Sequence, residues 1–456
     1  MITPAELRSR VHKRRDRYLG TLFELLSQPS VSATGEGVAA CAGLVARLMT
    51  DAGLRAEVRS TEGWPVVYGE LEQAPSYPTV LIYGHYDVQP PGDASLWQSP
   101  PFEPTIRLGR VYGRGAADNK GQFLAHLIAI RELLQLNAFP KLNVKMILEG
   151  EEEISSPHLH DYVVAHQESL ASDLVYSSDG PMHPSRLPTI SLGCRGMLAV
   201  ELTAVGSRRD LHSGQFGGVA PAPARTLVQL LASLQDDRGH VTIKGFYDQV
   251  QPPTGWECGV LRQLPLSKDQ FLDDISEDWE GAVDALSFYR RLMFEPNLNI
   301  AGLHSGYSGP GIKTVIPREA KAKIDIRLVV DQDPDVILEC LKDHIEALGL
   351  PVQIQRLGTM PPSRTSGKNP VVQTVIEAVR EATDREPVLE LCKGGTVPDY
   401  LFTSVMGLPS VWVPYANADS ANHAPDENLR LDCFFEGITI TGVVLQRVAE
   451  SIPARA

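Results

Sequence analysis

Residues 79–87 read TVLIYGHYD, an apolar run that ends in a glycine, a histidine, a tyrosine and an aspartate. The length and composition of the run predict a buried strand over Thr79–Tyr83. Since residues at i and i+2 of an extended chain face the same side, His85 and Asp87 can meet one site. There His85 supplies a neutral ring nitrogen, and Asp87 can accept a hydrogen bond that fixes the ring. A histidine and a surface aspartate at an ordinary strand end remain the simpler interpretation of these residues alone.

Helices and strands alternate on both sides of this strand. Apolar spacing near three and four predicts helices over residues 5–27, 37–52 and 120–136. Short apolar runs predict three further strands, over residues 66–71, 143–148 and 173–176. Strands that alternate with helices in this way predict an α/β domain with a mostly parallel sheet.

The alternation of helices with buried strands stops near residue 190 and resumes after Pro361 and Pro362. The intervening block contains strand and helix patterns over residues 197–205, 221–234, 320–330, 334–348 and 352–356. They predict a small α+β domain with one solvated sheet face. Beyond the block, a helix, a strand and a helix are expected over residues 370–382, 410–413 and 432–450. The simplest organisation is an α/β domain split into residues 1–191 and 363–456, with a second domain inserted over residues 192–362.

Composition and charge limit the classes of protein and partner. Hydrophobic residues make up 43% and charged residues 21% of the 456 residues, which is typical of globular domains and argues against disorder. The formal net charge of −14 repels nucleic acid and anionic lipid, so neither is an expected partner. The basic run Arg8–Arg17 is interpreted as a solvated helix face rather than as a nucleic-acid arm.

Cysteine usage and apolar segments bear on location. The six cysteines are scattered without a CxxC pair, which favours reduced thiols over a disulfide framework. The N-terminus has no apolar signal core. No run approaches the roughly 18 apolar residues that a membrane span needs. We therefore expect a soluble, cytoplasmic protein without a membrane partner.

Four further segments carry side chains that can bind metal ions, and each has an ordinary alternative. Asp118 begins the helix predicted over residues 120–136, so it could be an N-cap. The run Glu149–Glu153 follows an apolar strand, although charge runs are usually solvated loops. In such a run one carboxylate could bind a metal ion while its neighbour acts on a water molecule. Asp179 could be a turn residue, and His423 could be a surface histidine.

Together, these segments place histidines, aspartates and a glutamate at the ends of strands in one α/β framework. Binding sites in such sheets form at the carboxyl ends of the strands. Oxygen and nitrogen ligands without cysteine are typical of an open site for zinc, cobalt or manganese. The combination therefore predicts a catalytic rather than a structural metal centre.

Six motifs occur in a fixed order along the chain. They are GHYDVQP (84–90), GRGAADNKG (113–121), EGEEE (149–153), SSDG (177–180), RDLHSG (209–214) and NHAPDE (422–427). In this order they resemble the M20 metallopeptidase family, close to its cytosolic non-specific dipeptidases and carnosinases. The resemblance implies a zinc-exopeptidase catalytic domain of the phosphorylase/hydrolase-like type. It also implies an inserted α+β ferredoxin-like lid through which the chain forms a homodimer.

The resemblance implies a role for each candidate metal ligand. His85 and Asp179 correspond to the ligands of one ion, and Glu153 and His423 correspond to those of the other. Asp118 corresponds to the carboxylate that bridges the two ions. Zinc is the expected metal, with manganese or cobalt as alternatives.

The remaining implied residues take part in catalysis or in substrate binding. Glu152 corresponds to the general base, and Asp87 corresponds to the partner that orients the first histidine. His212 corresponds to a lid histidine that reaches the active site of the partner subunit, although it could simply cap a turn. The implied substrate contacts are Arg327, Thr314, Gly395 and Thr396. Arg327 also lies on a polar strand face, where arginine is common.

The expected activity is hydrolysis of the amide bond of dipeptides or short peptides with a free C-terminal carboxylate, through a water activated by two metal ions. The alternatives are an N-acyl amino acid deacylase or a carboxypeptidase of the same family, and, more remotely, a catalytically silent metal-binding scaffold. Two departures from the dipeptidases bear on the substrate. Thr396 replaces a serine, and Ala424 follows His423 where the dipeptidases carry serine. The sequence has neither the GxSxG elbow of a serine hydrolase nor the Gly-rich loop of a nucleotide-binding oxidoreductase, so these enzyme classes are not favoured.

Overall fold

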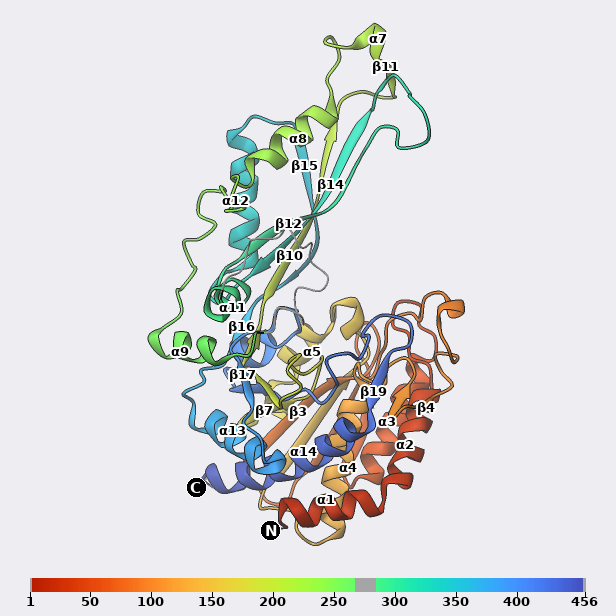
Figure 1. Ribbon diagram of the computed structural model, residues 1–456, viewed down its shortest axis with the longest axis vertical. Coiled ribbons are helices and arrows are strands. Elements are labelled where there is room, and N and C mark those ends of the chain that lie inside the picture. Colours follow the sequence, from red (N-terminus) through yellow and green to blue (C-terminus); the bar gives the residue numbers. More distant parts are fainter. Residues whose placement is uncertain (1, 267–283, 454–456) are drawn as a thin grey trace.

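The computed structural model describes residues 2–266 and 284–453, which form two unequal parts. Figure 1 shows a broad lower part that holds both termini and an elongated upper part that rises from it. The upper part comes from the middle of the sequence and is drawn mainly in green and cyan. The chain enters it after β9 (Gly193–Cys194) and leaves it at β16 (Ser363–Arg364), and these two short strands pair with each other.

Eight strands form one sheet in the lower part. Their order is β1 (Arg55–Arg59), β2 (Val66–Leu71), β6 (Asn143–Glu149), β3 (Thr79–His85), β7 (Leu174–Ser177), β18 (Ser410–Trp412), β8 (Thr189–Ser191) and β17 (Val388–Glu390). The neighbours β6 and β3, β3 and β7, β7 and β18, and β8 and β17 are parallel. The other adjacent pairs are antiparallel. The sheet is therefore mixed, with the predicted parallel arrangement at its centre.

Helices cover both faces of this sheet. One face packs against α1 (Pro4–Lys13), α2 (Arg15–Ser27), α3 (Val38–Asp51), α4 (Lys120–Gln135), α13 (Pro370–Thr383) and α14 (Leu431–Ser451). The other face packs against α5 (Leu159–Ala165) and the π-helix Leu401–Val405. Residues 120–133 of α4 are all buried, which explains why its apolar pattern extends around the helix. The sheet is thus the middle layer of three, as in other α/β domains.

The helix predicted over residues 5–27 is two helices, because Arg14 leaves the helical conformation with a φ of −114°. Both Arg10 and Arg14 point at Glu132 of α4, whose side chain is fully buried. Their guanidinium groups lie 2.7 Å and 3.1 Å from its carboxylate. The interpretation of Arg8–Arg17 as a solvated face is therefore wrong for these two arginines. They compensate a buried charge, and removal of one partner from such a pair is costly.

The upper part is built on a four-stranded antiparallel sheet. Its order is β12 (Asn297–Ser305), β14 (Glu319–Leu328), β10 (Gly196–Val205) and β15 (Val352–Met360). Alternate residues of β14 are buried, as its sequence predicts, and they pack against α8 (Pro223–Ser233) and α12 (Pro334–Ala347). The charged residues of β14 lie on the opposite face of the sheet.

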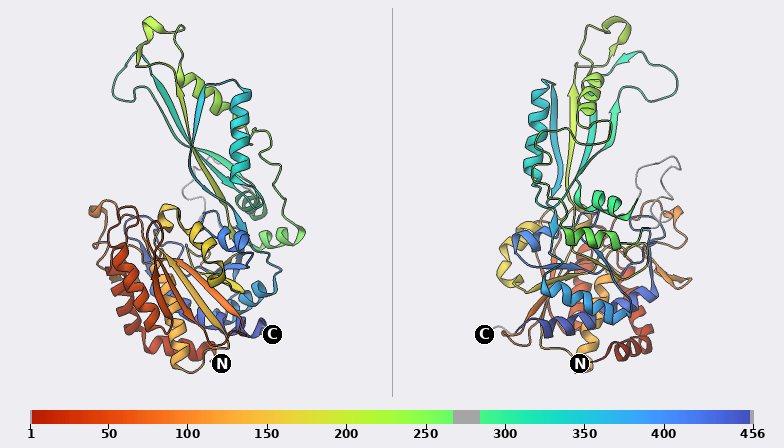
Figure 2. Two further views of the ribbon diagram at one scale, coloured as in Figure 1. Left: turned by 180° about the vertical axis from the view of Figure 1, so that it is seen from behind. Right: turned by 60° about the vertical axis from the view of Figure 1, so that its left-hand side comes forward.

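A small two-stranded sheet lies at the far end of the upper part. It pairs β11 (Leu211–His212) with β13 (Val315–Ile316), and α7 (Ser213–Phe216) follows β11 directly. Both figures place this tip at the end of the upper part that points away from the lower sheet (Figures 1 and 2).

The other short elements connect these layers. They are β4 (Thr105–Arg107), β5 (Arg110–Tyr112), β19 (Asn428–Arg430), α6 (Gln167–Leu170), α9 (Gly255–Gln263) and α11 (Ala285–Phe294). All six cysteines are free. Within the described ranges, no helix combines the length and the apolarity that crossing a bilayer requires.

Candidate metal centre

The five predicted metal ligands come from separate parts of the sequence and meet at one edge of the lower sheet. His85 ends β3, Glu153 lies four residues after β6, and Asp179 lies two residues after β7. These three strands are parallel neighbours, so their carboxyl ends lie together. Asp118 comes from the turn before α4, and His423 comes from the loop between β18 and β19.

Their side chains form two groups that share Asp118. In the first group, Nε2 of His85 lies 3.1 Å from Oδ1 of Asp118 and 3.8 Å from Oδ2 of Asp179. In the second, Nε2 of His423 lies 3.1 Å from Oδ2 of Asp118 and 3.2 Å from Oε2 of Glu153. The ligand atoms of each group all lie within 4.8 Å of one another. Asp118 thus presents one oxygen to each group, which is the geometry of a bridging carboxylate.

The position of Asp118 is fixed by its main chain rather than by a helix cap. The N-cap residue of α4 is Asn119, so the N-cap alternative for Asp118 is wrong. The amide of Asp118 donates to the carboxylate of Glu427 over 3.0 Å, and the amides of Ala117 and Gly115 donate to the same carboxylate. Arg114 neutralises Glu427 at 2.7 Å, and both side chains are buried. Glu427 is therefore a residue that positions Asp118.

Asp87 orients both the first histidine and the glutamate turn. Nδ1 of His85 lies 3.1 Å from the main-chain oxygen of Asp87 and 3.3 Å from its carboxylate. This contact leaves Nε2 of His85 free to face the ligand cluster. The carboxylate of Asp87 also accepts hydrogen bonds from the amides of Glu152 and Glu153, over 3.2 Å and 3.1 Å. One aspartate thus ties two of the ligand-bearing strand ends together.

Glu152 lies beside the ligands without belonging to either group. Among the described residues, no hydrogen-bond donor reaches its carboxylate, whereas Glu149 and Glu151 of the same run are engaged. Glu149 accepts from the hydroxyl of Tyr83 over 2.6 Å, and Glu151 accepts from the amide of Trp64 over 3.0 Å. The run is therefore not a solvated loop. Glu149 and Glu151 make structural contacts, Glu153 is a candidate ligand, and the carboxylate of Glu152 faces the cavity.

Burial and charge shift the pKa values in this cluster. Hydrogen bonds to Asp118 and Glu153 raise the pKa of His423 to about 10. Burial raises the pKa of Asp179 to about 6, with a further contribution from the charge of Asp118. Burial also raises the pKa of Glu152 well above its ordinary range. The two groups together contain three carboxylates and two histidines, and this donor set fits divalent cations.

A cavity of about 370 Å³ opens onto Glu152 and three of the candidate ligands, Asp118, Asp179 and His423. Its walls include the loop Gly394–Thr396 and Leu292 of the connecting helix α11. The hydroxyl of Thr396 accepts a hydrogen bond from Nη1 of Arg327 over 2.9 Å. The structure therefore brings two predicted substrate contacts, Gly395 and Thr396, into the wall of the cavity beside the candidate ligands, and it places Arg327 against Thr396.

The structure does not bring His212 and Thr314 to this cavity. Both are exposed at the tip of the upper part, where the amide of Ser213 donates to the main-chain oxygen of Thr314 over 3.1 Å. Nδ1 of His212 accepts from the amide of Gly214 over 3.0 Å, so within one chain this histidine caps a turn. Any role for these two residues in the site requires a second chain.

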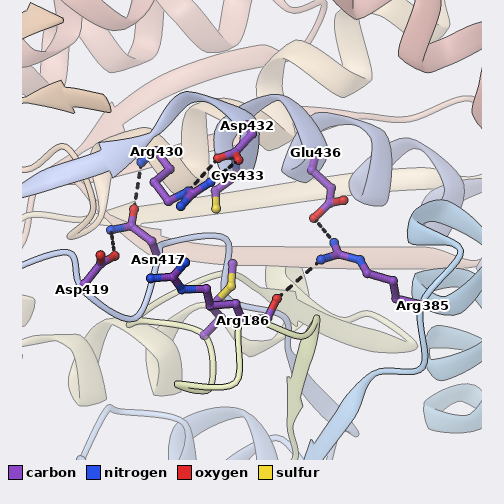
Figure 3. Close-up of a pocket in the computed structure, with 9 residues that line it drawn as sticks. Arg186, Arg385, Asn417, Asp419, Arg430, Asp432, Cys433 and Glu436 are labelled. Atoms are coloured by element: carbon purple, nitrogen blue, oxygen red, sulfur yellow. Dashed lines mark hydrogen bonds and ion pairs between the residues drawn. The ribbon is translucent and has the colours of Figure 1, made fainter. Parts of the chain in front are cut away.

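A separate cavity of about 190 Å³ has walls of charged side chains (Figure 3). Arg385 pairs there with Glu436, and Arg430 pairs with Asp432. None of the predicted site residues lines it. Because these charges largely pair with one another, we interpret this cavity as part of a structural ion-pair network.

Comparison with known proteins identifies relatives over most of the chain. A profile of peptidase family M20/M25/M40 matches residues 81–447, a range that contains all five candidate ligands. The Beta-Ala-His dipeptidase of Mus musculus is 30% identical over 385 residues, which cover 82% of this chain and 77% of that protein. The Cys-Gly metallodipeptidase of Schizosaccharomyces pombe is 28% identical over 466 residues, which cover 97% of this chain and 98% of that protein.

A solved structure is similar over nearly the whole length. It is an M20 family metallo-carboxypeptidase from Sulfolobus solfataricus, with a TM-score of 0.90 and 35% sequence identity. The similarity covers 95% of this chain and 99% of that one. The likeness therefore includes both the lower sheet and the upper part.

Proposed function

The chain belongs to peptidase family M20/M25/M40, and from this we propose that it hydrolyses the last amide bond of dipeptides or short peptides with a free C-terminal carboxylate. The observation that carries the proposal is the placement of Glu152 beside two ligand groups, in a cavity whose wall includes Thr396, the hydrogen-bond partner of Arg327. The dipeptidase names of relatives that cover most of the chain support the same class of substrate.

A metal-reconstitution assay tests this proposal. The metal-stripped enzyme is offered dipeptides, tripeptides and N-acetyl or N-succinyl amino acids, before and after addition of zinc, manganese or cobalt. We expect metal-dependent release of the C-terminal amino acid from peptides. Cleavage of acylated single amino acids alone would place the chain among deacylases. Absence of turnover with every metal would favour a silent metal-binding scaffold.

The proposed cofactor is a pair of divalent cations, with zinc as the expected metal. His85 and Asp179 would hold one ion, Glu153 and His423 would hold the other, and Asp118 would bridge them. Bound there, the cations would polarise the amide carbonyl and make a water molecule acidic near neutral pH.

The side chains of the protein supply the remaining steps. Glu152 accepts a proton from the attacking water and donates it to the leaving amine nitrogen. Its carboxylate suits this exchange, because burial raises its pKa well above that of an ordinary glutamate. Asp87 holds His85 and the amide of Glu152 in place. Arg327 and the Gly395–Thr396 loop bind the terminal carboxylate of the substrate.

Replacement of Arg327 by methionine tests the carboxylate contact. We expect kcat/KM for peptides with a free C-terminus to fall by about 10- to 100-fold, the loss of one charge-assisted interaction. Peptides with a C-terminal amide should be much less affected, since they carry no charge to bind. Lys321→Met alters the same face of β14 away from the cavity and serves as the control. Equal losses for both kinds of peptide would contradict the assignment.

We further propose that residues 192–362 form a lid through which two chains form a homodimer. The exposed tip that carries His212 and Thr314 would then reach the active site of the partner subunit, where the histidine would stabilise the oxyanion. A small peptide is the expected substrate, neither nucleic acid nor a membrane is an expected partner, and the proposed location is the cytoplasm.

Mixed dimers test the action of His212 across the interface. His212→Ala and Glu152→Ala chains are each expected to be inactive while retaining metal. Random mixing should restore about a quarter of the wild-type activity, because half of the dimers then contain one complete site. The measurement is turnover of the mixture, and of mixed dimers purified by two tags. No recovery in dimers of confirmed composition would contradict a contribution in trans.

The second candidate function is that of a carboxypeptidase that accepts longer peptides. The structure from Sulfolobus solfataricus that carries this description is 35% identical to the chain. The chemistry would be the same, and only the part of the cavity beyond the reacting bond would differ. That part of the cavity contains the charged side chain of Lys393.

A further inference from the structure

Lys393 places an ammonium group in the wall of the cavity, next to the metal ligands. Its Nζ donates to the main-chain oxygen of Asp179 over 2.5 Å. A Cβ atom added at Gly180 would lie 3.0 Å from the same Nζ, so the ammonium packs directly against this turn. Asp179 also faces His85 and belongs to the ligand cluster, so the charge of Lys393 lies directly beside this cluster.

The main chain fixes the direction of this side chain. The amide of Lys393 donates to the main-chain oxygen of Gly193 over 2.8 Å, and its own oxygen accepts from the amide of Arg195 over 3.0 Å. Three residues later, Thr396 faces Arg327. The loop therefore presents its threonine hydroxyl towards the proposed carboxylate contact and its lysine ammonium towards Asp179.

These positions define the two sides of a bound substrate. With the C-terminal carboxylate at Arg327 and Thr396 and the reacting carbonyl beside Glu152, we expect the acyl side to extend along the turn that begins at Asp179. Lys393 packs against that turn. In a free dipeptide the acyl side ends in an α-ammonium group two bonds from the reacting carbonyl carbon. An α-ammonium group placed on this side would be repelled by the Lys393 ammonium, in a cavity partly shielded from water.

Of the carboxylates in this wall, Asp118, Glu152 and Asp179 belong to the candidate metal centre, and Glu390 is already engaged. Glu390 accepts a hydrogen bond from the hydroxyl of Ser191 over 2.8 Å, and burial raises the pKa of its carboxyl group. The Glu390 carboxylate is therefore less available to neutralise the α-ammonium group of a dipeptide. The remaining lining in this region includes the apolar side chains of Met182, Leu292 and Met293.

We propose that Lys393 makes the enzyme prefer substrates whose residue before the cleaved bond has an acylated nitrogen, namely N-acyl dipeptides and peptides of three or more residues. The carbonyl oxygen of the acyl group accepts a hydrogen bond from the Lys393 ammonium, and no substrate cation lies opposite it. This inference rests on the proposed function, which it narrows from dipeptides in general to the removal of C-terminal residues from acylated or longer chains.

The test compares two substrates that differ by one acetyl group, alanyl-leucine and N-acetyl-alanyl-leucine. The measured quantity is the ratio of their kcat/KM values, acetylated over free, in zinc-reconstituted enzyme. A general loss of activity cancels in this ratio. We expect a ratio of about ten or more for wild type, the size of one charge-assisted hydrogen bond. Lys393→Met should lower the ratio about tenfold, and Lys393→Glu should reverse the preference.

The control is Lys368→Met, which removes an exposed lysine outside the cavity and should keep the wild-type ratio. Metal content and the thermal unfolding midpoint are measured for every variant. A ratio that stays constant in both Lys393 variants, including one in which both substrates lose activity equally, would overturn the inference but leave the proposed function intact. Failure of wild type to cleave either substrate with any metal would overturn the proposed function itself, and the inference with it.

Discussion

Replacement of Glu152 by glutamine is expected to lower kcat by about 10²- to 10⁴-fold, the usual contribution of a general base. Glutamine keeps the size of the side chain but cannot take a proton from water. Because Glu152 belongs to neither ligand group, the metal content of the variant should stay close to that of wild type. The measurements are kcat for a dipeptide and its N-acetyl derivative, and the metal content per chain by elemental analysis.

Glu151→Gln is the matched control for this prediction. Glu151 is the preceding residue of the same acidic run, but its carboxylate accepts from the amide of Trp64 and contacts His158 at 2.9 Å. We expect this variant to lose some stability and to keep kcat within a few-fold of wild type. Full activity of Glu152→Gln would remove Glu152 as the base. Loss of its metal would show instead that Glu152 is a ligand.

The fold and the position of the ligands could be predicted because strand ends are local features of the sequence. The apolar runs that predicted strands over residues 66–71, 79–83 and 143–148 correspond to β2, β3 and β6 within two residues at each end. Since parallel neighbours end at one edge, the residues that follow them meet without further assumptions. Family membership and the observed layers confirm the predicted α/β fold with an inserted α+β unit.

Elements without a regular pattern could not be predicted. Strand β12 lies at the edge of the upper sheet, and its apolar residues do not alternate with polar ones. Ile300 is 46% exposed and Leu303 is 60% exposed, and the pairing register shifts between Ile300 and Gly302. An edge strand with a bulge gives no period of two, so its pairing depends on tertiary contacts with β14.

Buried charges were the other source of error. Glu427 belongs to the NHAPDE motif, yet it is not among the predicted site residues. Only the fold brings it to Arg114 and to the amides before Asp118. Arg10 and Arg14 are likewise explained by Glu132, more than 110 residues away in the chain. The signal that could have identified Glu427 is its place inside a motif that carries a ligand.

Removal of Asp118 should have the largest effect on metal binding. Its two oxygens face different ligand groups, at 3.1 Å from His85 and 3.1 Å from His423. Asp118→Ala therefore takes a donor from both proposed ions at once. We expect the affinity for each ion to fall by more than about 100-fold, since loss of even an outer partner of a ligand costs about 10- to 100-fold. Turnover should be abolished at ordinary metal concentrations.

Single-group variants make this prediction specific. Asp179→Asn alters only the group that contains His85, and Glu153→Gln alters only the group that contains His423. Each should lower the affinity of the protein for one ion and leave its affinity for the other near the wild-type value, as measured by metal titration followed by elemental analysis. Loss of only one ion from Asp118→Ala would show that the aspartate does not bridge.

Glu427→Gln tests the same site through the residue that positions Asp118. The new amide side chain keeps one oxygen for the main-chain amides of Ala117 and Asp118 but loses the charge that pairs with Arg114. Because this variant moves the bridge rather than deleting it, both ions should weaken together, and by less than in Asp118→Ala. Weakening of one ion only would mean that Glu427 supports a single group, and the shared carboxylate would then not be the element that couples the two halves of the centre.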